Sequence, residues 1–483
     1  MAVDRAWFDT SELLAGGTWR PATGGGSIDV LDPSTGGGLC AIARGTSADI
    51  DAAVASARKA RGGDWGRATA AERGRLLARL GRLVEARAED LAAIEAQDVG
   101  KPLRQARADA ANLARYLEFY AGAADKLMGE TIPYLDGYTV LTHREPHGVT
   151  GHIIPWNYPM QILGRSLAPA LATGNAIVVK PAEEACLTAL ALARLADEAG
   201  FPPGVVNIVP GLGPEAGAAL AAHPGIDHIS FTGSAATGAS VQASAALNVV
   251  PVTLELGGKS PHLVFADADL DRALPFIVNS AIQNAGQTCS AGSRVLVERR
   301  RYDELLDRLA TRYRALRAGP ALTDPDLGPI VSARQKARIE AMLAEAPGHV
   351  AARGGIAPGA PAGGFYVAPA FLAGLPPEHR LNQEEIFGPV QSLIPFDDED
   401  EATEIANGTP HGLVAAVWTS DAARSMRLPK RLRAGQVYVN NYGAGGGVEL
   451  PFGGTGRSGH GREKGFEALY AFTTLKTVAI LHG

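Results

Sequence analysis

Cysteine is scarce in this chain of 483 residues, which contains only Cys40, Cys186 and Cys289. The three stand far apart and form no Cys-x-x-Cys pair. This spacing argues against a disulfide framework or a zinc site, and it favours a reducing compartment. The acids and histidines show no metal-ligand spacing either, so we expect no metal site.

The sequence also lacks a membrane segment, a signal peptide and a basic patch. The longest charge-free run, residues 231–254, is about 24 residues long, but polar residues, Gly and Pro interrupt it. The first residues, MAVDRAWFDTSELLAGG, carry early acids and no apolar core of a signal peptide. The net charge of -6 mixes both signs, so nucleic acid and membrane are not expected partners. We expect a soluble, cytoplasmic protein.

The length and composition indicate an ordinary globular protein of more than one domain. Hydrophobic residues make up 46% and charged residues 20% of the chain, as in typical soluble proteins. A chain of this length is too long for one simple core, so two or three domains are expected.

Short apolar strands alternate with helical segments after residue 147. The predicted strands are 148–154, 176–180, 205–209, 226–233 and 250–256, and a second α/β pattern runs to about residue 440. Such alternation predicts a parallel sheet with helices on both faces. Before it, the spacing from Thr69 predicts a capped helix that continues to about Gln97. The dipeptide Asp136-Gly137 predicts a hairpin that adds to another sheet.

Ligands of parallel α/β sheets bind outside the carboxyl ends of the strands, where this chain carries polar residues and glycine. Lys180 and Glu183 are either ribose ligands or a surface pair. Gly233 and Ser234 follow a strand and open a helix, so they either bind a phosphate or form a turn with a helix cap. Asn157 is either an oxyanion donor or a structural turn residue.

Two stretches place an isolated acid and an isolated cysteine about 30 residues apart. Glu255 lies in ELGGKSP, and Cys289 lies in GQTCSAGSR among small, uncharged residues. A thiolate is a strong nucleophile, and a nearby carboxylate can serve it or a water as base. The alternative is a buried structural thiol. Glu385 and Phe387, in EEIFGP, could likewise contact a ribose or form a solvated turn.

Seven motifs in order resemble the NAD(P)-dependent aldehyde dehydrogenase superfamily, of the hydrolytic type, along nearly the whole chain. They are PWNYP (155–159), KPAE (180–183), FTGS (231–234), ELGGKSP (255–261), GQTCSAGSR (286–294), EEIFGP (384–389) and PFGGTGRSGHGRE (451–463). The resemblance implies an α/β fold with a Rossmann-like cofactor domain (1–127 and 147–256), an α/β catalytic domain (257–455) and a small β oligomerisation segment (128–146 and 466–483).

The resemblance also implies a mechanism. Cys289 attacks the aldehyde carbonyl, and the Asn157 amide with the Cys289 backbone N–H holds the oxyanion. Hydride transfer to the nicotinamide leaves a thioester, which a water releases with Glu255 as general base. The covalent intermediate divides one difficult oxidation into two easier steps.

By the same resemblance, a set of residues contacts the cofactor. Glu183 is expected to repel a 2′-phosphate, so NAD is favoured over NADP. The expected cofactor contacts are Ile153, Pro155, Trp156, Lys180, Glu183, Gly213, Phe231, Gly233, Ser234, Leu256, Glu385 and Phe387.

The substrate is expected to be a small aldehyde that is polar, carboxylated or aromatic. Arg165 takes the position where the succinate-semialdehyde branch receives a carboxylate, although it could equally be a structural Arg. Tyr158 and Thr288 are further candidate substrate contacts. The glycines at 443 and 445–447 leave the expected tunnel wall bare, which suits a bulky or aromatic substrate.

Two other functions stay open at this point. A CoA-acylating aldehyde dehydrogenase would pass the thioester to CoA, but Glu255 argues for hydrolysis by water. A non-catalytic dinucleotide-binding protein of the same fold is the second alternative, and the presence of Cys289, Asn157 and Glu255 argues against it. The resemblance implies a homodimer or homotetramer.

Overall fold

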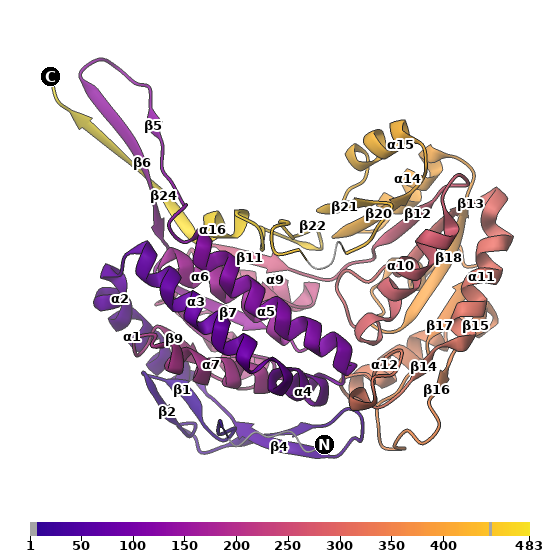
Figure 1. Ribbon diagram of the computed structural model, residues 1–483, viewed down its shortest axis with the longest axis horizontal. Helices are drawn as coiled ribbons and strands as arrows, with labels where there is room; N and C mark the ends of the chain where they lie inside the picture. The colour runs from indigo at the N-terminus through magenta and orange to yellow at the C-terminus, as the bar shows by residue number, and fades with distance from the viewer. Residues whose placement is uncertain (1–6, 444–446) are drawn as a thin grey trace.

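The structure, a computed structural model, describes residues 7–443 and 447–483. Two sheets stand side by side and a narrow β arm projects from the first of them (Figure 1). The arm carries the C-terminus at its tip. The structure therefore has three parts, and the site lies where the first two meet.

The first sheet has eight strands, of which the central five are parallel. The chain runs outward from β7 through β8 to β9, then returns to the other side of β7 to form β10 and β11. Ligands bind at the carboxyl side of such a reversal. In spatial order the strands are β2 (Thr18–Arg20), β1 (Leu13–Ala15), β9 (Val206–Ile208), β8 (Ala176–Pro181), β7 (Val149–Ile154), β10 (His228–Thr232), β11 (Val252–Glu255) and β23 (Gly459–His460).

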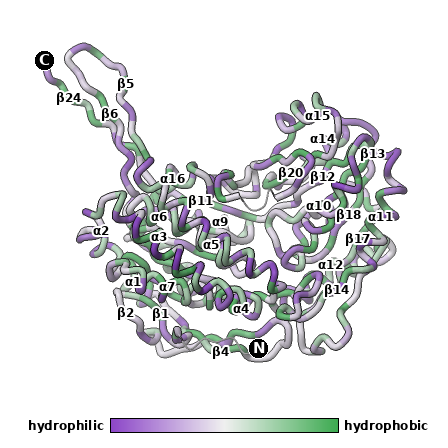
Figure 2. Tube along the Cα trace, viewed as in Figure 1, coloured by the Kyte–Doolittle hydropathy of each residue, from purple (hydrophilic) through white to green (hydrophobic). Residues whose placement is uncertain are grey.

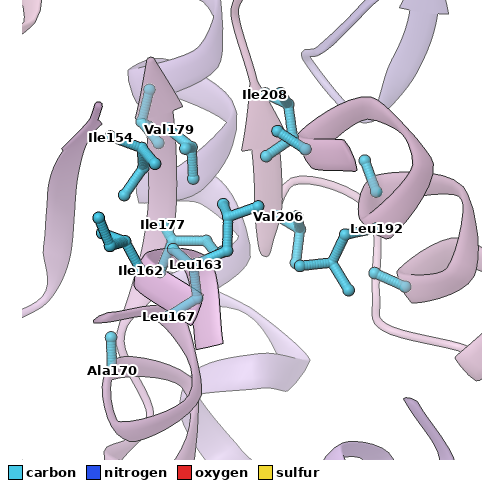
Figure 3. Packing of buried hydrophobic residues seen from close by; sticks show 14 of the residues in the cluster. Ile154, Ile162, Leu163, Leu167, Ala170, Ile177, Val179, Leu192, Val206 and Ile208 are labelled. Carbon is cyan, nitrogen blue, oxygen red and sulfur yellow. The ribbon is translucent and has the colours of Figure 1, made fainter. Parts of the chain in front are cut away.

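Helices cover this sheet because its strands are apolar on both faces. Ile177 and Val179 of β8 and Ile154 of β7 pack with Ile162 and Leu163 of α6 (Figure 3). The helices of this part are α1 (Ser47–Gly62), α3 (Ala70–Ala86), α4 (Ala88–Val99), α5 (Leu103–Ala123), α6 (Pro159–Thr173), α7 (Leu187–Ala199), α8 (Ala218–Ala221) and α9 (Ala235–Ala246), with a π-helical turn η1 (Gly213–Gly217) before α8.

The prediction of a single helix from Thr69 to about Gln97 is wrong, because the helix is interrupted at Arg87. Thr69 and Glu72 do form the predicted capping box. Arg87, however, has φ -106° and ψ 15° and separates α3 from α4. Arg87 lies in line with the buried residues Leu77, Leu80 and Val84 of α3, where a continuous helix would need an apolar side chain. Its guanidinium instead pairs with Asp90 at 3.1 Å and lies over the ring of Trp7.

The second sheet has seven strands and is covered on both faces. Val295 and Val297 pack with α10 and α11, whereas Leu296 points to the opposite face and packs with α14, as strand alternation requires. The strands are β15 (Val350–Arg353), β17 (Ala370–Ala373), β18 (Val390–Phe396), β13 (Arg294–Glu298), β12 (Pro261–Val264), β20 (Val414–Trp418) and β21 (Gln436–Val439), with helices α10 (Leu270–Ile282), α11 (Tyr302–Ala315), α12 (Ala333–Leu343) and α14 (Glu399–Asn407).

The arm is a three-stranded antiparallel sheet of β24 (Thr473–Leu481), β6 (Tyr138–Pro146) and β5 (Thr131–Ile132). The predicted hairpin at Asp136-Gly137 is present between β5 and β6. Green, hydrophobic segments alternate with white and purple ones along the arm in Figure 2. Its exposed large apolar residues are Ile132, Tyr134, Leu135, Tyr138, Leu475, Ile480 and Leu481.

The remaining elements are short connections. Within residues 7–443 and 447–483, none of the helices combines the length and hydropathy needed to cross a bilayer. The short elements are β3 (Ser27–Leu31) with β4 (Gly38–Ala43), β14 (Arg317–Ala318) with β16 (Gly355–Ile356), β19 (His411–Gly412) with β22 (Thr455–Gly456), and α2 (Asp64–Arg67), α13 (Arg380–Gln383), α15 (Ala422–Arg427) and α16 (Glu467–Ala471).

Candidate active site

A cavity of about 510 Å³ lies between the two sheets and contains the predicted nucleophile. Cys289 lines it together with Asn157, Tyr158, Arg165 and Thr288, all of which were candidates from sequence. Aromatic rings form much of the remaining wall: Tyr116, Phe276, Tyr438, Tyr442 and Phe452. The structure thus brings the oxyanion, nucleophile and substrate candidates into one place.

The backbone before Cys289 makes a tight turn that directs this residue into the cavity. α10 ends at Ile282, and Asn284 and Ala285 then adopt left-handed φ values of 47° and 54°. Gly286 follows with φ 73°, and a Cβ there would come within 2.1 Å of the Gly388 carbonyl oxygen. Left-handed residues of this kind cost free energy and cluster at functional sites.

Asn157 is fixed beside Cys289 by hydrogen bonds at both ends. Its side-chain Nδ2 donates to the Gln287 backbone carbonyl at 3.0 Å. The backbone carbonyl of Asn157 accepts from Asn284 Nδ2 at 2.8 Å. The Tyr158 hydroxyl is hydrogen-bonded to Thr288 Oγ1 at 3.0 Å. An amide nitrogen carries two N–H groups, so Asn157 retains one donor for an oxygen bound in the cavity.

Glu255 lies at the end of β11, next to the cavity but outside its lining. The side chain is buried, and within the described residues neither carboxylate oxygen has a hydrogen-bond partner. Burial, and then the neighbouring Glu463, raises the pKa of Glu255 well above its ordinary value. Burial also raises the pKa of the Cys289 thiol to about 12, against a lowering by Arg165. The resting thiol is therefore protonated and needs a base.

Arg165 already has a partner of opposite charge. Its guanidinium forms a buried ion pair with Glu463 and lies 5.0 Å from the Phe452 ring centroid. Lys464 lines the same cavity, and sequence reasoning missed it. It has a left-handed backbone, with φ 63°, directly after the PFGGTGRSGHGRE motif. Burial, and then Arg165, lowers the pKa of Lys464 to about 8. No periodicity in the sequence could have placed it there.

Lys180 and Glu183 meet at the end of β8. The Lys180 ammonium is 2.7 Å from Glu183 Oε2, and the Gly213 N–H donates to Glu183 Oε1 at 3.4 Å. Burial is the largest influence on Glu183 and would raise its pKa, but the charge and hydrogen bond of Lys180 and the backbone N–H donors together lower it. Glu183 is thus a charged acceptor at the edge of the sheet, where a sugar hydroxyl can donate to it.

The start of α9 offers a site for a phosphate. Ser234 caps this helix, with its Oγ accepting from the Thr237 N–H at 3.2 Å, and the residue is exposed. A Cβ on Gly233 would meet the Phe231 ring at 2.6 Å, so only glycine keeps this approach open. Leu256 packs beneath the helix, where a Cβ on Gly238 would touch it at 2.6 Å. These contacts fit a dinucleotide pyrophosphate.

On the cavity side, the loop of Phe387 meets the end of β7. The Phe387 ring packs edge-on against Trp156 with centroids 5.3 Å apart, and its backbone is left-handed, with φ 58°. Glu385 accepts from the Gly258 N–H at 3.1 Å, and burial raises its pKa to about 7. Glu385 thus lies against the ELGGKSP motif, and Phe387 lies against the PWNYP motif. Ile153 and Pro155, at the end of β7, are likewise half-buried.

Two negative observations complete the description. Among residues 7–443 and 447–483, no group of three or more His, Cys, Asp or Glu side chains is arranged to hold a metal ion. Gly443 lines the cavity, and a Cβ there would meet nothing within 4 Å. Gly445 and Gly446, also expected to bare the tunnel wall, lie outside the described residues.

Comparison with known proteins identifies this arrangement. The family model described as "Aldehyde dehydrogenase family" matches residues 19–478. Retinal dehydrogenase 2 of Rattus norvegicus is 42% identical over 477 residues, which cover 97% of this chain and 92% of that protein.

Solved structures agree along the whole length. A Burkholderia cenocepacia structure, provisionally named an aldehyde dehydrogenase, is 64% identical with a TM-score of 0.96 and covers 98% of this chain and 100% of that one. The NAD⁺ complex of a Bacillus cereus aldehyde dehydrogenase is 39% identical with a TM-score of 0.95, covering 99% and 98%. This chain therefore belongs to the aldehyde dehydrogenase family and is an enzyme that oxidises aldehydes.

Proposed function

We propose that this enzyme oxidises a small aldehyde to its carboxylic acid with NAD, through a covalent intermediate on Cys289. The observation that carries the proposal is the shared cavity of Cys289 and Asn157, with the buried carboxylate of Glu255 near enough for its charge to act on Cys289. A thiol, an amide donor and a carboxylate base are the groups that oxidation through a thioester needs.

Each side chain has one task in this scheme. Cys289 gives its proton to a water in the cavity, and its sulfur forms a bond to the carbonyl carbon while the π electrons move to oxygen. The free N–H of Asn157 and the Cys289 backbone N–H donate to that oxygen. NAD, when bound, supplies the acceptor for the hydride that leaves the same carbon. Glu255 then takes a proton from a water, whose oxygen attacks the thioester, and the carbon–sulfur bond breaks.

The cofactor would lie across the carboxyl ends of β7, β8 and β10. Lys180 and Glu183 would hold the adenosine ribose, and the start of α9 at Gly233 and Ser234 would hold the pyrophosphate. Glu385 and Phe387 would hold the nicotinamide ribose. The lowered pKa of Glu183 keeps this residue charged, so it opposes a 2′-phosphate. NAD is therefore preferred to NADP.

Replacing Glu183 with serine is expected to weaken this preference. Removing a like charge from the 2′-phosphate site should raise kcat/KM for NADP on the order of 10- to 100-fold while lowering it for NAD. Initial rates of reduced-cofactor formation with each dinucleotide measure the effect. Glu184→Ser is the matched control, because this neighbouring acid contacts Arg334 instead of Lys180. An unchanged NADP rate in Glu183→Ser would contradict the assignment.

The cavity favours an aldehyde that bears an anionic group on an aromatic or otherwise bulky body. Arg165 is paired with Glu463 on one side, yet within the described residues its Nη2 has no hydrogen-bond partner. Lys464 brings a second cation to the same wall. A substrate carboxylate could bind both, and the tyrosine and phenylalanine rings of the wall would hold the rest of the molecule.

A panel of aldehydes tests the activity and the substrate class together. NADH formation is followed with aliphatic, amino, aromatic and carboxylated aldehydes, including the matched pair para-carboxybenzaldehyde and para-tolualdehyde. In Lys464→Met the kcat/KM ratio for this pair should fall on the order of tenfold, and Lys464→Arg should restore most of it. A ratio that stays unchanged in Lys464→Met and in Arg165→Ala would rule out the anionic site. No turnover with any aldehyde would rule out the proposed function.

The arm is proposed to assemble the enzyme as a homodimer or homotetramer in the cytoplasm. Its seven exposed apolar side chains form a surface that a lone three-stranded sheet would not keep in water. The division into a cofactor domain, a catalytic domain and an oligomerisation segment stays a prediction with the boundaries given above.

A further inference from the structure

Cys289 lies in a tight turn of four residues, from Thr288 to Ala291. The Ala291 N–H donates to the Thr288 carbonyl at 3.0 Å, so Cys289 and Ser290 are the two central residues of a β-turn. The orientation of this turn determines where the Cys289 sulfur points and where the Cys289 backbone N–H points. Both groups act on the same carbonyl in the proposed function. They can reach it together only while the turn keeps one orientation.

Two tyrosine hydroxyls hold this turn. The hydroxyl of Tyr158, which follows β7 of the first sheet, is hydrogen-bonded to Thr288 Oγ1 at 3.0 Å. The hydroxyl of Tyr442, which follows β21 of the second sheet, donates to the Ser290 carbonyl oxygen. All four residues line the cavity. The residues on either side of Cys289 are thus each bound by a side chain, one from each sheet.

A buried ammonium under the Tyr158 ring restricts the position of that ring. Lys101 Nζ is 3.9 Å from the ring centroid. Lys101 is fully buried between two carboxylates, with Nζ 2.7 Å from Glu95 Oε1 and paired also with Asp109. The two carboxylates keep the cation in place, and the cation attracts the face of the ring. Lys101 therefore helps to fix the direction of the Tyr158 hydroxyl.

The Tyr442 ring is supported in a different way, by an imidazole of the second sheet. The rings of Tyr442 and His262, on β12, have centroids 4.5 Å apart. Trp418 Nε1 donates to His262 Nδ1 at 3.1 Å, and His262 Nε2 is 2.8 Å from Ser280 Oγ. Since both of its nitrogens are hydrogen-bonded, the imidazole is a fixed surface for the Tyr442 ring.

We propose that Tyr158 and Tyr442 are positioning residues for the attack of Cys289 on the carbonyl, because their hydroxyls fix the turn that directs its sulfur and its backbone N–H. This inference rests on the proposed role of Cys289 as nucleophile. An attack gains much of its rate from correct orientation, and an oxyanion donor is effective only at hydrogen-bond distance. Loss of either hydroxyl therefore slows formation of the acyl-enzyme without changing the number of active sites.

A double-mutant cycle tests the hydrogen bond at Thr288. Tyr158→Phe and Thr288→Val each remove one hydroxyl and keep the shape of the side chain. Each should lower the rate constant of the NADH burst roughly tenfold at saturating NAD, with an unchanged burst amplitude. The double variant should be no slower than either single variant, because the same bond is lost only once. Unchanged single variants, or losses that multiply in the double variant, would overturn the proposal.

Tyr366→Phe is the matched control for Tyr442→Phe. The Tyr366 hydroxyl also donates to a backbone carbonyl, that of Ser34 at 2.6 Å, but Tyr366 does not line the cavity. Each variant loses one hydrogen bond of this kind, so thermal unfolding should show a loss of stability in both. The burst rate constant should fall roughly tenfold in Tyr442→Phe alone. Equal burst rate constants in the two variants would contradict a positioning role.

Two reagents test the same geometry without NAD. p-Nitrophenyl acetate reacts with a thiol at a carbonyl carbon and needs the oxyanion donors, whereas iodoacetamide reacts at a saturated carbon and needs none. Tyr158→Phe and Tyr442→Phe should slow the first reaction roughly tenfold and leave the second within about twofold of wild type. Mass spectrometry of the peptide that contains Cys289 measures both. Equal slowing of the two reactions would mean that the tyrosines control access to the thiol, which overturns the proposal.

Failure of the proposed function gives a different result. A wild-type enzyme that shows no burst, or a burst that persists in Cys289→Ala, removes the nucleophile itself. A normal wild-type burst with unchanged tyrosine variants overturns the positioning role alone.

Discussion

Replacing Cys289 with alanine should abolish NADH formation, lowering kcat by on the order of 10⁴-fold or more, because no other described side chain of the cavity offers a thiol for the covalent step. The pKa of the thiol is raised by burial, and the variant removes the sulfur without leaving a buried charge. We therefore expect Cys289→Ala to fold and to bind NAD with nearly wild-type affinity. Steady-state rates and calorimetric binding of NAD measure the two properties.

Cys40→Ala is the matched control for this experiment. Cys40 lies on β4, outside the cavity, and is half-buried, as Cys289 is. Its removal should leave kcat within about twofold of wild type, as expected for a position away from the reacting atoms. Substantial turnover by Cys289→Ala, or an equal loss in Cys40→Ala, would contradict a nucleophile at Cys289.

Glu255→Gln should leave formation of the thioester unchanged and block its hydrolysis. The variant can still form the thioester, so we expect a burst of a single NADH equivalent per active site. Steady-state turnover should then fall by roughly 10²- to 10⁴-fold, the usual contribution of a general base. Rapid-mixing absorbance records the burst, and intact-protein mass spectrometry shows the acyl group on Cys289.

The pH dependence of thioester hydrolysis tests the same role of Glu255. A general base works only when it is deprotonated, and the pKa of Glu255 is raised by burial and by Glu463. The rate of hydrolysis in the wild type should therefore rise with pH through a midpoint above the ordinary range of a glutamate, and this rise should be absent in Glu255→Gln. A variant that shows no burst, or that keeps the rise, would place the base elsewhere.

Local patterns were enough to predict most of the first sheet. The strand expected at 176–180 is β8, Ala176–Pro181, and the one at 148–154 is β7, Val149–Ile154. Buried parallel strands are continuous apolar runs between turn residues, so their position depends on neighbours in sequence. The motif residues at their carboxyl ends, such as Asn157, follow from the same pattern.

The residues that could not be predicted depend on contacts between distant segments. Glu463 meets Arg165 across 298 positions of sequence, the difference of the two residue numbers, and no spacing rule connects them. The left-handed backbone of Phe387 and Lys464 is imposed by the packing of loops, since neither residue favours it. The helix break at Arg87 likewise has no glycine or proline that would mark it in the sequence.

The strand order of the first sheet also determines which strand edge is exposed during synthesis. β23 pairs with β11 to close the first sheet, and the Phe472 carbonyl accepts from Asn175 Nδ2 at 2.9 Å. During synthesis β23 leaves the ribosome long after β11, so β11 presents an open edge until β23 has emerged. Open edges invite pairing with other chains. A chain truncated before residue 459 lacks the partner of β11 and is thus expected to aggregate more readily.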